Sequence, residues 1–306
     1  MLSQMTSFFN SAFYFAGTHW DAILLSIALG LVFGAVWLFF YFPPIFKKQW
    51  FWVVIAVSAI LSWSAIAFVQ IPFQNWYVDA ITHFWGSKDL SSWYLLIAFP
   101  LVLISGIVQE ATKLAPVLLS WWRSKKSFTP RFGLMLGAVS GAGFGVFEAI
   151  WVHNQIFAQG ISWSVVDNYA LALWERVFAV AFYIATSALT GYGIAKKKGW
   201  LFYVIAAFLH GIVNFSAILI EDNKLTSLQS EFYLTFIAVA VTGWALWLRW
   251  RPEKEIPAEI SPAGTPGDTS EIDPVVVPAA DEIPPVVTPD VTPLVVTPDV
   301  IPPPVS

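Results

Sequence analysis

Seven long apolar stretches, separated by short polar segments, run through most of the chain. Each holds about 20 residues or more, which as a helix is enough to cross a hydrocarbon core about 30 Å thick. The stretches cover residues 21–43, 50–72, 93–121, 133–157, 171–195, 200–220 and 231–249. This pattern predicts an all-α fold, a polytopic transmembrane helical bundle of about seven spans within a domain at residues 21–250.

The basic residues predict how this bundle is oriented. Lysine and arginine gather in the loops after the first, third, fifth and seventh stretches, for example at Lys47, Arg123, Lys197 and Arg251. Cytoplasmic loops of membrane proteins are enriched in such residues. We therefore expect a multi-pass protein of the cell membrane with its N-terminus outside and its C-terminus inside.

The two ends of the chain differ from the middle. Residues 1–20 are apolar and aromatic but too short to cross a bilayer, so we expect an interfacial segment there. Residues 251–306 are rich in Pro, Val and Thr, and PVVTPDV at 285–291 is nearly repeated by LVVTPDV at 294–300. Frequent proline disfavours helix, so these residues predict a disordered cytoplasmic tail. A cytoplasmic partner that docks on the tail is one alternative to a passive linker.

Composition agrees with a lipid environment and narrows the chemistry. The 306 residues are 57% hydrophobic and only 12% charged. The absence of cysteine excludes disulfides, thiolate metal sites and cysteine nucleophiles. Any metal would need His, Glu, Asp or Asn as its ligands. We expect the lipid bilayer as a partner and no nucleic acid.

Ionisable residues within the third span are the first sign of a functional site. Gln109, Glu110 and Lys113 occur together in GIVQEATKLAP, and their spacing places Lys113 beside both of the others on a helix. Charged groups inside a span are costly, so they usually have a partner or a function. A self-neutralising pair is the simpler interpretation of this group.

The fourth span combines a glycine repeat with a second acid. Gly133, Gly137, Gly141 and Gly145 recur every four residues, and small residues at that spacing allow close helix packing. Glu148 follows one turn later, so we expect its carboxylate inside the protein.

The outer ends of the fourth and fifth spans carry further polar residues. His153 lies near the end of the fourth span, where we expect an interfacial residue. Glu175 and Arg176 begin the fifth span, and a snorkelling ion pair explains them most simply. Tyr183 follows two turns later.

The sixth span contains His210 and Asn214 in FLHGIVNF, one turn apart on one helical face. Together with Glu110 and Glu148, they supply the ligand types of a zinc site. Catalytic zinc keeps an open position for water and lowers the pKa of that water to about 7. Such a water could attack an amide while Asn214 or Tyr183 stabilises the oxyanion.

The order of these motifs resembles a known family. QEATK, FGVFE, an arginine and a tyrosine with six residues between them, and HGIVN together resemble PrsW-type intramembrane metalloproteases and, more distantly, the CPBP group that includes CAAX endopeptidases. The resemblance covers about residues 95–220. It implies a divergent member that hydrolyses a membrane-anchored protein, such as an anti-sigma factor or another single-span target.

The resemblance also implies roles for individual residues. Glu110 and Glu148 would be acids that activate water or bind metal. His210 would bind a divalent metal, which we expect to be zinc. Asn214 would bind the metal or the oxyanion. The supporting residues would be Gln109, Lys113, Arg176 and Tyr183.

Two departures from the family pattern keep other functions open. Gln109 stands where the family has the first acid of a pair, and Tyr183 stands where an additional histidine is expected. Both favour impaired catalysis or a non-catalytic membrane scaffold with a protease-like fold. A small-solute transporter is a further alternative, although the sequence shows neither an inverted repeat nor a pair of broken helices.

Overall fold

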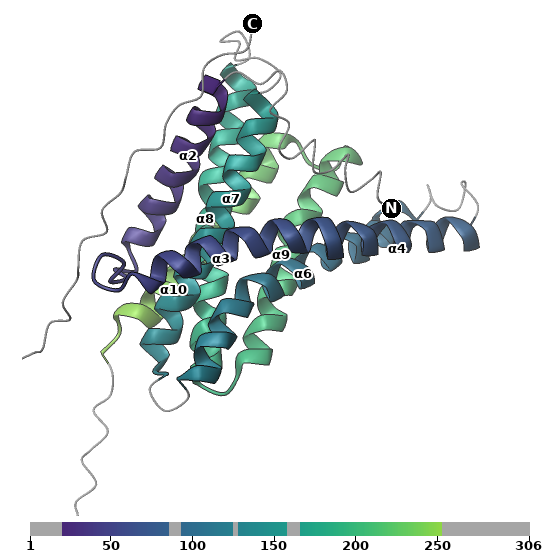
Figure 1. The fold of residues 1–306 in the computed structure, drawn as a ribbon. Helices are drawn as coiled ribbons and strands as arrows, with labels where there is room; N and C mark the ends of the chain where they lie inside the picture. Colours follow the sequence, from purple (N-terminus) through teal and green to yellow (C-terminus); the bar gives the residue numbers. More distant parts are fainter. Residues whose placement is uncertain (1–19, 86–92, 125–127, 158–165, 253–306) are drawn as a thin grey trace, which may run out of the picture. The chain divides into compact units, whose positions relative to one another are not determined.

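The computed structural model describes residues 20–85, 93–124, 128–157 and 166–252, and these residues confirm the all-α prediction because they contain no strand. The predicted interfacial segment at 1–20 and the predicted tail lie almost entirely outside them. The helices are α2 (Trp20–Phe39), α3 (Trp50–Ala65), the π-helical turn η1 (Ile66–Gln70), α4 (Ile71–Phe84), α6 (Tyr94–Arg123), α7 (Pro130–Phe157), α8 (Val166–Ala195), α9 (Gly199–Glu221) and α10 (Ser227–Trp250) (Figure 1).

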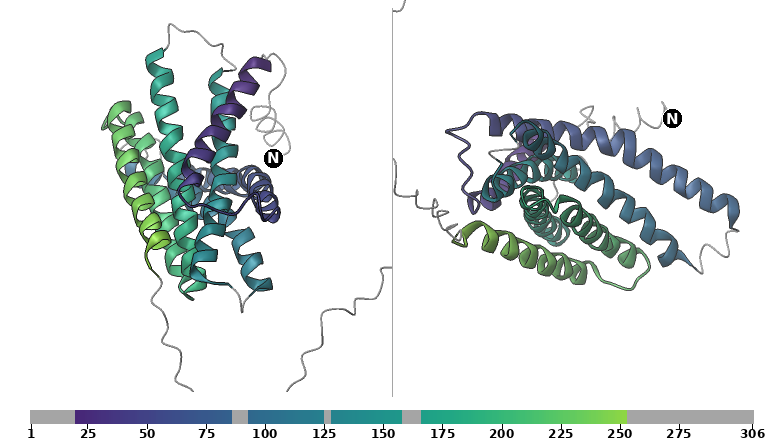
Figure 2. Two further views of the ribbon diagram at one scale, coloured as in Figure 1. Left: turned by 90° about the vertical axis from the view of Figure 1, so that its left-hand side faces the viewer. Right: turned by 90° about the horizontal axis from the view of Figure 1, so that it is seen from below.

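Seven helical segments of the described chain are long and apolar enough to cross a membrane, as predicted. The second differs from the expectation. It does not end near residue 72 but continues through η1 and α4 as one segment of 35 residues, Trp50–Phe84. The segment crosses the direction of α7 and α8 rather than running alongside them (Figures 1 and 2).

The glycine repeat of α7 explains why α7 and α8 form the centre of the bundle. A Cβ atom on Gly137 would lie 2.0 Å from the carbonyl oxygen of Ser187, and one on Gly141 would lie 2.3 Å from that of Tyr183. Only a residue without a side chain allows the two backbones to come this close. The repeat thus sets the distance between α7 and α8, and with it the position of the polar side chains on both.

A second close approach joins α6 to α9. A Cβ on Gly106 of α6 would lie 2.3 Å from the carbonyl oxygen of Ala207 on α9. Glycine at this position brings the polar residues that follow it, beginning with Gln109 and Glu110, next to the histidine one turn beyond Ala207. The remaining helices surround the core, with α2 and α3 against α7 and α10 against α8.

Basic residues that follow the third span and end the seventh come together at one end of this bundle, where they also contact residues at the ends of the first and fifth spans. Arg249 Nε donates to the carbonyl oxygen of Tyr41 at 2.8 Å, and Arg131 donates to the carbonyl oxygen of Arg251 at 3.0 Å. Arg251 also contacts the hydroxyl of Tyr192. The predicted grouping of basic loops is therefore reproduced in three dimensions, while the side of the membrane that they face stays a prediction.

Candidate active site

The ion pair predicted within α6 is present and deeply buried. Glu110 Oε1 lies 2.5 Å from Lys113 Nζ, and both side chains are almost inaccessible to solvent. Lys113 Nζ also lies over two aromatic rings, 4.5 Å from the centroid of Tyr183 and 4.9 Å from that of Phe144. Opposite charges and π-faces together offset the cost of burying an ammonium group.

Glu110 also binds His210, which is 100 positions away in sequence. Glu110 Oε1 lies 2.9 Å from His210 Nδ1, and the hydroxyl of Thr186 on α8 approaches the same oxygen at 3.4 Å. One carboxylate thus joins α6, α8 and α9. His210 Nε2, the other ring nitrogen, is buried and has no hydrogen-bond partner among the described residues.

Gln109 points in another direction, because neighbouring positions on a helix are rotated by about 100°. Its Nε2 atom donates to Gln70 Oε1 at 3.0 Å. Gln70 ends the π-helical turn η1, and such turns are frequent at functional sites. Gln109, at the position where the family resemblance led us to expect an acid, therefore links α6 to η1, and Gln70 joins the candidate site although the sequence analysis did not predict it.

The second acid, Glu148, has a different cation as its partner. Arg176 NH1 lies 3.0 Å from Glu148 Oε2, and Arg176 also pairs with Glu175. The predicted Glu175–Arg176 pair therefore exists, but the interpretation as a snorkelling pair is wrong for Arg176, which is buried and turned toward α7. The glycine packing of α7 on α8 brings these two helices close enough for this contact.

Tyr183 lies between the two ionic clusters. Its ring centroid is 5.3 Å from that of His210 and 5.0 Å from that of Phe144. Its hydroxyl interacts with the Glu148 carboxylate, which is near enough to interact electrostatically with Lys113 and His210 as well. The residues predicted from four separate spans thus converge on one buried region.

Asn214, like Gln109, forms no hydrogen bond with either of the two acids in the described structure. Its Nδ2 atom donates to Ser105 Oγ on α6 at 2.8 Å. Asn214 instead lines a cavity of about 340 Å³ between α8, α9 and α10, together with Arg176 and Tyr183. Tyr183 therefore contacts His210 on one side and the cavity on the other.

Glu231 also lines this cavity and was missed by the sequence analysis. It lies in the second turn of α10 and is buried, and its Oε2 atom has no hydrogen-bond partner among the described residues. Its position at the start of an apolar stretch resembles an ordinary span end. What distinguishes Glu231 is a buried carboxylate without a partner among the described residues, beside α8, and this feature exists only in the folded chain.

His153 is also placed differently from the prediction. It is 1% exposed rather than interfacial, and it packs against Phe33 and Phe157 with ring centroids 5.8 and 5.7 Å away. Its Nδ1 lies 2.7 Å from the carbonyl oxygen of Ala149. The close packing of α2 on the end of α7 covers it, which the sequence of α7 alone does not reveal.

The candidate metal ligands do not form a complete set. Within the described ranges, no three or more His, Asp or Glu side chains are grouped so that they could hold one ion. His210 Nε2 is the atom best suited to a metal, because its lone pair is unused when Nδ1–H donates to Glu110. Glu148 is a further candidate, and Arg176 already neutralises it.

The described chain is a helical bundle able to span a membrane, and it buries two acids and a histidine on three of its helices. The family model for PrsW family intramembrane metalloproteases matches residues 46–244. The chain belongs to this family. The match extends beyond residues 95–220, so it includes the long α3–α4 segment and most of α10. No curated protein and no solved structure matched the chain.

Proposed function

We propose that this chain hydrolyses a peptide bond in a membrane-anchored protein, at or within the bilayer. Its membership in a family of intramembrane metalloproteases supports this activity in general. The observation that carries the proposal is the hydrogen bond between Glu110 and His210, which leaves His210 Nε2 unpartnered inside the bundle. A buried polar atom without a partner is costly, and it is retained more readily where it has a task.

The geometry favours His210 rather than Glu110 as the group that accepts a proton. Glu110 receives hydrogen bonds from Lys113, His210 and Thr186, and each of them lowers its ability to act as a base. Its role is then to hold His210 in the tautomer that carries the proton on Nδ1. Nε2 can accept a proton from water, as the base of a hydrolase must do.

The cavity supplies the other requirements of amide hydrolysis. Its volume of about 340 Å³ leaves room for water and part of an extended peptide in a region otherwise surrounded by apolar helices. Asn214 and Arg176 line it. The N–H groups that their bonds to Ser105, Glu148 and Glu175 leave unused can stabilise the oxyanion that forms when water attacks the carbonyl carbon. Tyr183 lies between the cavity and His210, so we propose that its ring controls whether water or substrate in the cavity reaches His210.

The family description implies a divalent metal, and we retain zinc as its proposed identity. Two candidate ligands are available, His210 Nε2 and the Glu148 carboxylate, whereas catalytic zinc sites typically use about three protein ligands. The residues therefore do not make a complete zinc site, and no step of the proposed mechanism passes through a metal.

The proposal can be tested by identifying the N- and C-termini of membrane proteins in cells that express different variants of this chain. Wild-type chain, His210→Ala, His210→Asn and the exposed-acid control Asp79→Asn would be expressed in the same cells. We expect new termini near the membrane segments of single-span proteins with the wild type and the control, and with neither His210 variant. The same termini with a folded His210 variant would overturn the proposal.

A non-catalytic scaffold is the second candidate, and one observation favours it. Lys113 already neutralises Glu110, and Gln109 donates a hydrogen bond from its side-chain amide to Gln70. Glu110 and Gln109 therefore both contribute to assembly of the bundle. If this is their whole task, loss of His210 would change complex formation with other membrane proteins but no protein termini.

A further inference from the structure

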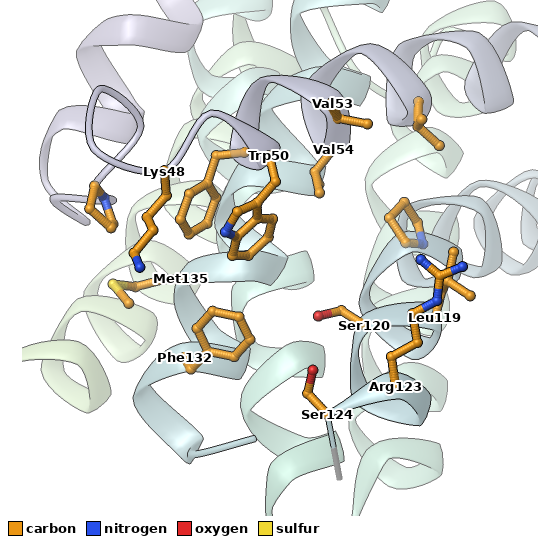
Figure 3. Close-up of a pocket in the computed structure, with 14 residues that line it drawn as sticks. Lys48, Trp50, Val53, Val54, Leu119, Ser120, Arg123, Ser124, Phe132 and Met135 are labelled. Carbon is orange, nitrogen blue, oxygen red and sulfur yellow. The ribbon is translucent and has the colours of Figure 1, made fainter. Parts of the chain in front are cut away.

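A second pocket lies at the opposite, basic end of the bundle, outside the candidate active site. It has a volume of about 640 Å³ and is bounded by the start of α3, the end of α6 and the start of α7 (Figure 3). None of its 14 lining residues is an acid. It shares no residue with the cavity that Asn214 lines.

The walls of this pocket continue the lipid-facing surface of the protein. Val53, Val57 and Leu119 line it and are 61%, 38% and 50% exposed. Trp50 and Phe132 form its inner wall, with ring centroids 5.6 Å apart. In a chain that spans a membrane, apolar side chains with this exposure face acyl chains.

The polar residues of the pocket are cationic or carry hydroxyls. Lys48 and Arg123 lie on opposite sides of it, and the hydroxyls of Ser120 and Ser124 point into the space between them (Figure 3). Both cations are exposed, and neither forms a salt bridge with an acid of the described chain. Two cations with hydroxyl donors between them match a phosphate group in charge and in hydrogen bonding.

We propose that this pocket binds an anionic phospholipid, with the headgroup phosphate between Lys48 and Arg123 and an acyl chain along Val53, Val57 and Leu119. Cationic pockets between helices at a membrane surface recognise anionic headgroups in this way. A zwitterionic lipid fits less well, because its headgroup cation would meet two further positive charges. The site is independent of the proposed hydrolysis.

Native mass spectrometry of the purified full chain in detergent tests the site. Phosphatidylglycerol and phosphatidylcholine with identical acyl chains would be titrated against wild type, the double variant Lys48→Gln/Arg123→Gln, and the control Lys196→Gln/Lys198→Gln. The control removes the same charge from the same end but outside the pocket. We expect wild type and control to prefer phosphatidylglycerol by about 10- to 30-fold, and the pocket variant to lose this preference.

The other outcomes distinguish the occupant. Equal loss of preference in both double variants would overturn the proposal, because the charge of the whole end would then be responsible. Complete displacement by millimolar glycerol 3-phosphate would overturn the role of the acyl chain.

A second measurement maps the lipid directly and does not depend on any substitution. Phosphatidylglycerol with a photoactivatable group on an acyl chain would be cross-linked to the wild-type chain, and the modified peptides would be sequenced. We expect labels on residues 50–57 and 116–120, which face each other across the pocket. Labels spread evenly over all lipid-facing helices would contradict a defined site.

Discussion

Glu110 on α6 and His210 on α9 share a hydrogen bond of 2.9 Å in the interior of the bundle, although 100 positions separate them in the sequence. The same Glu110 oxygen lies 2.5 Å from Lys113 Nζ. One carboxylate therefore balances a buried cation and fixes the ring of the histidine. Structural stability and the proposed chemistry depend on the same three residues, and suitable variants can separate the two.

The buried pair of Glu110 and Lys113 leads to the first prediction. Glu110→Gln and Lys113→Met should each reduce the free energy of unfolding by about 3–5 kcal/mol, because each leaves an unpaired charge in the bundle. The double variant should lose less than the sum of the two single variants. Unfolding in mixed detergent with increasing denaturant measures all three against Asp79→Asn. Additive losses would contradict a direct interaction.

The contact between α7 and α8 gives a prediction with an internal control. Gly137→Ala would place a Cβ 2.0 Å from the Ser187 carbonyl oxygen, so we expect a loss of about 2 kcal/mol or more. Gly243→Ala on α10 makes the same chemical change where no atom lies within 4 Å. It should leave stability unchanged or raise it by about 0.5–1 kcal/mol. Thermal unfolding of both variants tests the difference, and equal midpoints would disprove it.

The incomplete ligand set predicts weak metal binding that one substitution should strengthen. Tyr183→His would add an imidazole nitrogen as a third metal ligand beside His210 and Glu148, since Tyr183 contacts both residues. We expect zinc to leave the wild type on dialysis against a chelator and to remain at near one equivalent in Tyr183→His. Elemental analysis measures the retained zinc, with Tyr183→His/His210→Ala as the control. Tightly held zinc in the wild type would mean that the ligand set is more complete than described.

Glu231 should show a conflict between stability and activity. Its buried Oε2 atom has no partner among the described residues, so Glu231→Gln removes an unpaired carboxylate and should raise the unfolding midpoint by a few degrees. If the cavity is the substrate site, the same variant should reduce cleavage of membrane proteins. A calorimetric scan and the terminal analysis described above provide the two readouts. A lower midpoint would indicate that the carboxylate has a stabilising partner in the membrane.

The spans and the motifs were predictable because each depends on neighbours within one helix. Length and hydropathy define a span, and the glycine spacing of α7 predicts close packing whichever helix lies against it. The family pattern likewise consists of short local motifs, so the sequence led to the correct family. The continuation of the second span through η1 was not predicted, because residues 71–84 are less apolar and resemble a loop at a membrane surface.

Contacts between helices were decided only by the tertiary structure. Helical periodicity tells that Glu110 and Lys113 share a face, but it does not tell which helix that face meets. The partners of Glu148, the burial of His153 and the unpaired acid at Glu231 all depend on the rotation and neighbours of packed helices. The sequence by itself determined a membrane bundle of the PrsW family and predicted candidate residues for its chemistry. Packing of glycine against backbone decided which of those residues meet, because it sets the distances between α7 and α8 and between α6 and α9.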